Sequence, residues 1–122
     1  MDFDETYSPV MNDATFRMLL IIQSTYAYAY CILDVQTAFL YGVLSQDESI
    51  YMKAPPGVET SDDECLMLLK TLYGLSQSSL KFFEVLKAAL LKSGLKQSRA
   101  DPCLFYHKDG DLFLGIHVDD VC

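Results

Sequence analysis

Two strand-like runs late in the chain flank an Asp-Gly pair, and this feature constrains the fold more than any other. Residues 102–107 (PCLFYH) and 112–118 (LFLGIHV) are rich in residues that favour strands, and residues 108–111 (KDGD) lie between them. An Asp-Gly pair suits the backbone angles of a tight hairpin turn. The pattern therefore predicts a β-hairpin, and with it an antiparallel sheet.

Two segments have the spacing of helices. Residues 13–27 (DATFRMLLIIQSTYA) begin with a polar residue suited to an N-cap and continue with apolar residues at helical intervals. Residues 77–94 (QSSLKFFEVLKAALLKSG) end at Gly94, a typical helix stop. The apolar face of this second segment is predicted to consist of Phe82, Phe83, Leu86, Ala89 and Leu90.

Three further segments are predicted to be strands. Residues 29–35 (AYCILDV) indicate a buried strand that ends near Asp34. Residues 48–57 (ESIYMKAPPG) alternate and stop at a Pro-Pro pair, and residues 65–70 (CLMLLK) form a short apolar run after the polar loop 61–64. Strands mixed with two long helices predict an α+β fold, an antiparallel sheet with two main helices packed on one face. A parallel α/β fold is the alternative.

Length and composition indicate one globular domain. The chain has 122 residues, of which 51% are hydrophobic. Its longest strongly apolar run, residues 18–22, is far shorter than the ~20 residues that cross a bilayer, and acidic residues precede it. We therefore expect an intracellular, non-secreted chain without a membrane span.

The cysteine spacing argues against a zinc site, and the net charge argues against strong binding to nucleic acid. Cys31, Cys65, Cys103 and Cys122 are widely spaced and lack a zinc-ligand pattern, so they are predicted to be reduced packing residues. The net charge is -8. Affinity for nucleic acid phosphates depends on clustered Lys and Arg side chains. A chain as acidic as this one is therefore expected to bind nucleic acid weakly or not at all.

An acidic pair, Asp119 and Asp120, follows the second strand of the predicted hairpin. A further turn and a returning strand would be expected there, but only Val121 and Cys122 follow, so the returning strand is expected to lie outside residues 1–122. Asp34 also ends a predicted strand, so three carboxylates converge if the two strands are neighbours in the sheet. Like charges so close require a cation, and two Mg²⁺ ions would meet that need. The alternative for the acidic pair is a solvated turn, and the alternative for Asp34 is a cap or turn residue.

Six ordered blocks carry a family resemblance. They are DETYSPV (4–10), LDVQTAFLYG (33–42), IYMKAPPG (50–57), LYGLSQS (72–78), ADPCLFYH (100–107) and HVDD (117–120). In this order they resemble the reverse transcriptase, an RNA-directed DNA polymerase, of copia-type LTR retrotransposons. The resemblance covers nearly the whole chain.

The resemblance implies a catalytic site with metal ions. Asp34, Asp119 and Asp120 match the catalytic aspartates of the family's polymerase palm and would hold two Mg²⁺ (or Mn²⁺) ions, with the backbone carbonyl of Val35 as a further ligand. The 3′-hydroxyl of a primer would attack the α-phosphate of a deoxynucleotide. The implied partners of the intact enzyme are an RNA or DNA template-primer and a dNTP.

The resemblance also implies two nucleotide-binding residues. Phe39 matches the bulky aromatic that lies against the sugar and leaves no room for a 2′-hydroxyl. Gln77 matches a glutamine near the incoming nucleotide and template. From the residues alone, Phe39 would be a core side chain and Gln77 an ordinary residue at a helix N-terminus.

Several positions depart from the family's pattern. Members usually carry Lys in place of Gln36 and Ser76 and often Arg in place of Leu80, so three basic positions are neutral here. Phe82 replaces a usual Trp, and His117 replaces a Tyr or Phe. His117 is predicted to pack as a neutral strand residue; as a metal ligand it would be unusual, because Mg²⁺ favours oxygen.

The expected domain is a single partial reverse transcriptase palm over residues 1–122. The family's fingers segment, thumb and ribonuclease H are expected outside these residues, so the isolated chain is expected to be inactive. The family implies a cytoplasmic particle or the nucleus as its location. The alternative function is a non-catalytic acidic relic or interaction module derived from a retrotransposon.

Overall fold

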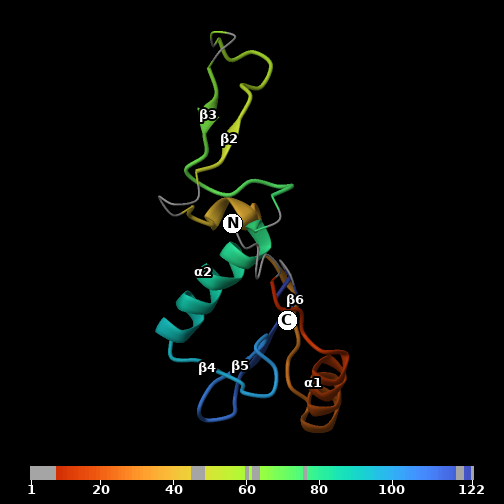
Figure 1. Cartoon of the computed structure of the whole chain (residues 1–122). Coiled ribbons are helices and arrows are strands. Elements are labelled where there is room, and N and C mark those ends of the chain that lie inside the picture. The colour runs from red at the N-terminus through yellow and green to blue at the C-terminus, as the bar shows by residue number, and fades with distance from the viewer. Residues whose placement is uncertain are drawn as a thin grey trace.

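A five-stranded antiparallel sheet and two helices form the main part of the molecule (Figure 1). The computed structural model describes residues 8–44, 49–59, 61, 64–75, 77–117 and 120–121. The helices are α1 (Asp13–Tyr26) and α2 (Ser78–Lys92). In sheet order the strands are β1 (Leu33–Asp34), β7 (Asp120–Val121), β6 (Phe113–His117), β5 (Leu104–Tyr106) and β4 (Lys96–Gln97). The α+β prediction is confirmed.

The predicted hairpin is present as β5 and β6. Tyr106 lies opposite Phe113, and the backbone N–H of His107 donates to the carbonyl of Leu112 over 2.9 Å. Gly110 has a φ of 73°, a left-handed conformation that glycine adopts without strain. The Asp-Gly pair therefore makes the turn that its sequence predicts.

A separate two-stranded sheet consists of β2 (Tyr51–Met52) and β3 (Leu66–Met67), which pair antiparallel. It projects from the top of the view in Figure 1, away from the larger sheet. Both strands are shorter than the predicted segments 48–57 and 65–70. The Pro-Pro pair lies beyond β2, as expected for residues that limit a ladder.

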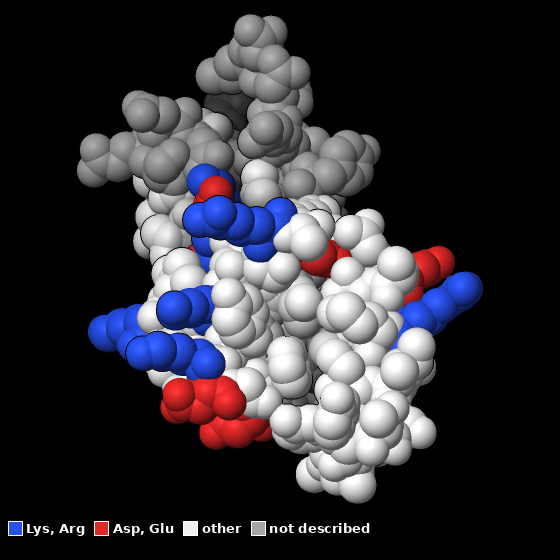
Figure 2. Space-filling model, turned by 90° about the horizontal axis from the view of Figure 1, so that it is seen from below, with Lys and Arg blue, Asp and Glu red and all other residues white. Residues whose placement is uncertain are grey.

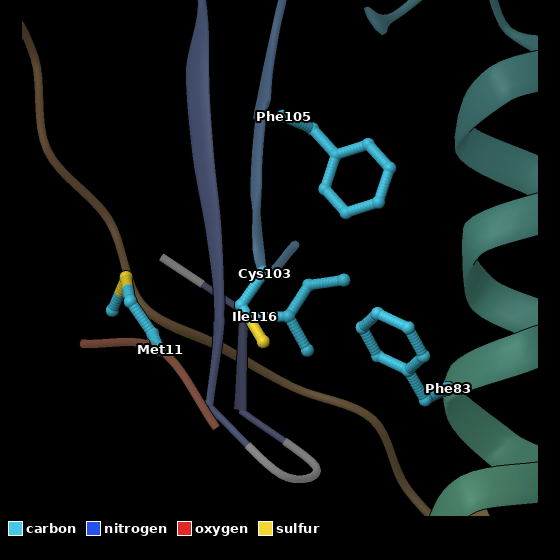
Figure 3. Packing of buried hydrophobic residues seen from close by; sticks show 5 residues of the cluster. All are labelled: Met11, Phe83, Cys103, Phe105 and Ile116. Carbon is cyan, nitrogen blue, oxygen red and sulfur yellow. The ribbon is translucent and has the colours of Figure 1, made fainter. Parts of the chain in front are cut away.

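The hydrophobic core lies between the β5–β6 hairpin and α2. Alternation along the strands puts Phe105 and Ile116 on the same face, and Figure 3 shows both between the strands and Phe83 of α2. Both are fully buried. The predicted face of α2 is confirmed except at Ala89, which is exposed. Met11 completes the cluster from the other side of the strands (Figure 3).

Helix α1 has a different environment, because none of its residues is buried. It ends at Ala27, which has a φ of 53°, and Tyr28 then turns back to the hairpin. The Tyr28 ring lies edge-on to Phe113, with 6.2 Å between centroids, and its hydroxyl donates to the carbonyl of Gly110 over 2.8 Å. Among the described residues, no helix is sufficiently long and apolar to cross a membrane.

Two strand predictions need correction. Within residues 29–35 only Leu33 and Asp34 form a strand, and Leu33 is 56% exposed, so the prediction of a buried strand is wrong. The reason is that β1 lies at the sheet edge and pairs only with β7. Asp120 belongs to the returning strand β7, so the two residues before Cys122 suffice to form that strand.

The cysteines fall into two groups. Cys31, Cys65 and Cys103 are free thiols, as predicted, but only Cys103 is buried; Cys122 lies outside the described residues. Burial and the neighbouring Asp101 charge raise the pKa of the Cys103 thiol to about 11. Cys103 is therefore a protonated packing residue, whereas the packing prediction is wrong for Cys31 and Cys65.

A buried carboxylate joins the start of α1 to the start of β5. Asp101 is 1% exposed; its Oδ2 accepts the backbone N–H of Asn12 and its Oδ1 that of Cys103, each over 2.9 Å. Burial acts to raise the pKa of Asp101, but hydrogen bonds from Thr15, Asn12 and Cys103 outweigh it and lower that pKa below 3.8. The charged form is thus favoured in the folded chain.

We predict that Asp101→Asn lowers the free energy of unfolding at neutral pH by about 1–3 kcal/mol, since the amide nitrogen would face a backbone N–H donor. The lowered folded pKa means that this contribution is complete above the ordinary pKa of 3.8 and is lost as pH falls through the folded value. Urea unfolding of the chain at pH values from neutral to acid measures both effects.

The matched control for this prediction is Asp109→Asn, because the Asp109 side chain is 75% exposed and Asn-Gly also suits the turn. We expect the control to keep the acid dependence of the wild-type chain. An unchanged acid dependence in Asp101→Asn itself would contradict the role assigned to this carboxylate.

Candidate functional site

Two of the three acidic positions that were predicted to converge, Asp34 and Asp120, are adjacent in the backbone of the sheet. Asp34 on β1 lies directly opposite Asp120 on β7, and Asp120 in turn lies opposite His117 on β6. The strands that carry Asp34 and Asp120 are therefore neighbours, as a shared site requires. The Asp34 side chain is exposed, so it is accessible to a ligand.

Asp119 and Val118 lie outside the described residues, and so does the side chain of Asp120. Within the described part of the chain, no group of three His, Cys, Asp or Glu side chains could hold a metal ion. The donor set predicted for the metal ions thus extends beyond the described side chains. Its observed part is the backbone register of Asp34 with Asp120.

Val35 directs the chain from β1 into a short helix. Its carbonyl accepts the backbone N–H of Ala38 over 3.2 Å, which closes a turn before the 3₁₀-helix η1 (Ala38–Tyr41). Thr37 in this turn has a φ of 54°. Because a carbonyl oxygen has two lone pairs, this hydrogen bond leaves the Val35 carbonyl one position for another ligand.

Phe39 lies on η1, and its ring contacts two other aromatic rings. Its half-buried ring meets Tyr73 edge-on, with 4.8 Å between centroids and 72° between planes, and Phe82 at 6.5 Å and 89°. The sequence pattern predicts no role for Tyr73, although Tyr73 belongs to the same LYGLSQS block as Gln77. The periodicity that marks helix faces gives no signal for this turn residue.

Thr71 and Gly42 hold η1 close to the segment before α2. The fully buried Thr71 hydroxyl donates to the carbonyl of Phe39, and the Thr71 N–H donates to the carbonyl of Gly42 over 3.0 Å. A Cβ on Gly42 would overlap Thr71 Oγ1 and lie 2.8 Å from the Cβ of Lys81. A residue without a side chain is therefore required here.

Gln77 is the N-cap residue of α2. Its backbone carbonyl accepts the N–H of Lys81 over 3.0 Å, and its half-buried side chain makes no capping hydrogen bond. Next to it, the Ser78 hydroxyl donates to the carbonyl of Leu72 over 2.5 Å. The structure thus places Gln77 at the end of the helix that packs against η1, while the ring contacts of Phe39 come from Tyr73 and Phe82.

Charge is unevenly distributed over the molecule. Figure 2 shows several Lys and Arg side chains, with Asp and Glu beside them, on the left, the side on which α2 and β4 lie in Figure 1, and an uncharged area at the lower right. Helix α2 and strand β4 carry Lys81, Lys87, Lys92 and Lys96. The net charge of -8 is therefore an average over faces of different character.

Comparisons with known proteins identify a family. Residues 1–122 match the family described as reverse transcriptase (RNA-dependent DNA polymerase). The chain is 33% identical over 125 residues to the Retrovirus-related Pol polyprotein from transposon RE2 of Arabidopsis thaliana and 31% over 126 residues to that from transposon TNT 1-94 of Nicotiana tabacum. It is 30% identical over 123 residues to the Transposon Ty1-ER2 Gag-Pol polyprotein of Saccharomyces cerevisiae.

These alignments cover 99%, 99% and 96% of the chain but only 8%, 9% and 7% of the relatives. The chain thus spans less than a tenth of the polyproteins that it matches. No solved structure matches the chain. The family expected from the six sequence blocks is confirmed by the match over residues 1–122.

We predict that Gly42→Ala destabilises the chain by about 1–3 kcal/mol, the usual effect of an added methyl group in a packed site. The φ of Gly42 is -65°, so the backbone accepts alanine and the loss is purely steric. The measurement is urea unfolding of Gly42→Ala in the wild-type chain and in a Thr71→Ala background.

Thr71→Ala removes the atom that the new methyl group would overlap. The effect of Gly42→Ala is therefore expected to be smaller in that background, a non-additivity that marks residues in contact. Strictly additive losses would show that the close approach of η1 and Thr71 does not limit this position.

Proposed function

The chain belongs to the reverse transcriptase (RNA-dependent DNA polymerase) family, and we propose that, within a longer copia-type polyprotein, it supplies the catalytic centre for RNA-directed DNA synthesis. The observation that carries this proposal is the register of β1 with β7, which places Asp34 opposite Asp120. Two acidic positions far apart in sequence are adjacent in the sheet, as a shared metal site requires.

Asp34, Asp119 and Asp120 are the proposed catalytic residues and metal ligands. Carboxylate oxygens are the ligands that Mg²⁺ prefers, and the free lone pair of the Val35 carbonyl adds a fourth oxygen donor of the same kind. Two Mg²⁺ or Mn²⁺ ions bound here would stabilise the attacking and leaving oxygens of an in-line displacement at phosphorus. The exposure of Asp34 supports access by a primer 3′-hydroxyl.

Phe39 is the proposed residue that selects deoxynucleotides. It lies in the short helix η1, which follows Asp34 after one turn, so its ring lies on the same segment as a proposed metal ligand. A rigid ring held between Tyr73 and Phe82 has little freedom to move aside for a 2′-hydroxyl. Gln77, at the start of α2, is proposed to contact the nucleotide or template from the helix that packs on η1.

We predict that Asp34→Asn in the polyprotein lowers primer extension on an RNA template by more than about 100-fold, because even groups that only orient metal ligands contribute 10- to 100-fold. The control is Asp109→Asn, an exposed position at the opposite end of the β5–β6 hairpin. Steady-state incorporation of dNTP with Mg²⁺ is the measurement.

Retention of primer extension by Asp34→Asn would contradict the catalytic assignment. A polyprotein that binds Mg²⁺ with affinity dependent on Asp34 and Asp119, yet extends no primer, would instead support a non-catalytic acidic module. The two functions are thus separated by one set of variants and two measurements, metal affinity and primer extension.

We predict that Phe39→Val raises the use of ribonucleotides relative to deoxynucleotides, because the smaller side chain leaves room for the 2′-hydroxyl. A single added group in an apolar pocket changes discrimination by about 10- to 200-fold, which sets the expected size. Single-nucleotide insertion of matched rNTP and dNTP measures the ratio. An unchanged ratio would remove Phe39 from the proposed nucleotide site.

A further inference from the structure

The two rings beside Phe39 are held in different ways. Phe82 is 3% exposed and belongs to the core face of α2, so it is a fixed wall. Tyr73 is 61% exposed and lies in the turn before α2, yet its ring centroid is the closer one, at 4.8 Å from that of Phe39. The Phe39 ring thus contacts one buried ring of the core and one exposed ring of the turn.

The backbone around Tyr73 is fixed at several points. The Thr71 hydroxyl donates to the carbonyl of Phe39, and the Ser78 hydroxyl donates to that of Leu72 over 2.5 Å. The N–H of Leu75 approaches the carbonyl of Leu72 at 3.4 Å, and Gly74 has a φ of 93°, so residues 72–75 form a tight turn. The chain before and after Tyr73 is therefore tied to η1 and α2.

We propose that Tyr73 is a positioning residue that fixes the orientation of the Phe39 ring and thereby sharpens selection against ribonucleotides. This inference rests on the proposed function and deepens it. An edge-to-face contact favours one orientation of the two rings, and without it the Phe39 ring turns more freely on its exposed side. Because Tyr73 is mostly exposed, its removal opens no cavity in the core, so selection and stability are separable.

The experiment compares Tyr73→Ala and Tyr73→Phe in the polyprotein, with single-nucleotide insertion of matched rNTP and dNTP. Tyr73→Ala is expected to raise the rNTP:dNTP ratio of kcat/KM by roughly three- to tenfold, the range that an aromatic pair contributes. Tyr73→Phe keeps the ring and is expected to keep the wild-type ratio. Tyr51→Ala, a tyrosine of similar exposure on β2, is the matched control and is expected to leave the ratio unchanged.

A double-mutant cycle tests whether Tyr73 acts through Phe39. In a Phe39→Ala background, Tyr73→Ala is expected to change the ratio no further, because the ring that it positions is absent. An additional change of the same size in that background would overturn the positioning role and would indicate direct contact of Tyr73 with the nucleotide. Thermal unfolding of each variant checks that the effect is not a loss of folded protein.

Three further outcomes overturn the inference. An unchanged ratio in Tyr73→Ala, with a wild-type polyprotein that extends primers, overturns the inference alone. Loss of selection in Tyr73→Phe equal to that in Tyr73→Ala would show that the hydroxyl, and not the ring contact, is responsible. A wild-type polyprotein that extends no primer overturns both the proposed function and the role of Tyr73. If the Tyr73→Ala variant inserts nucleotides too slowly for the measurement, Tyr73→Leu is used instead, and the same rise in the rNTP:dNTP ratio is expected.

Discussion

The buried Asp101 carboxylate joins the segment before α1 to the segment before β5, two parts of the chain that are far apart in sequence. It accepts backbone N–H groups from Asn12, directly before α1, and from Cys103, directly before β5. The carbonyl of Cys103 in turn accepts the N–H of Ile116 over 2.9 Å, which sets the register of the hairpin. Since β1 follows α1 and β7 follows β6 along the chain, these hydrogen bonds lie in the segments that lead to the pairing of Asp34 with Asp120.

A second unit surrounds Phe39 and is held by different forces. Here the close approach of Gly42 to Thr71 brings η1 against α2, and aromatic rings from the turn and the helix enclose the Phe39 side chain. The proposed metal site depends on strand register, whereas the proposed nucleotide site depends on side-chain packing. The link between them is the short run from Asp34 through Thr37, whose left-handed conformation turns the chain into η1.

Much of the fold follows from local sequence patterns. The helix predicted over residues 77–94 is observed as Ser78–Lys92, and the Asp-Gly turn joins β5 to β6. The prediction of a buried strand over residues 29–35 was wrong. Its strand part, β1, lies at a sheet edge, and hydrophobicity alone does not distinguish an edge strand from a central one. The position of Asp34 and the acidic pair at strand ends made their adjacency possible, but only the structure shows that β1 and β7 are neighbours. The contact of Tyr73 with Phe39 depends on tertiary packing, for which no periodicity gives a signal.

The pairing of β1 with β7 also sets an order of events during synthesis. Asp34 leaves the ribosome before its partner Asp120, and the whole intervening sequence is synthesised between the two. Closing so long a loop is slow and is favourable only after the intervening contacts have formed. The helices and the β5–β6 hairpin can therefore assemble first, and the acidic site is completed last. A nascent polyprotein would in this way acquire its proposed metal ligands only when the surrounding fold is already in place.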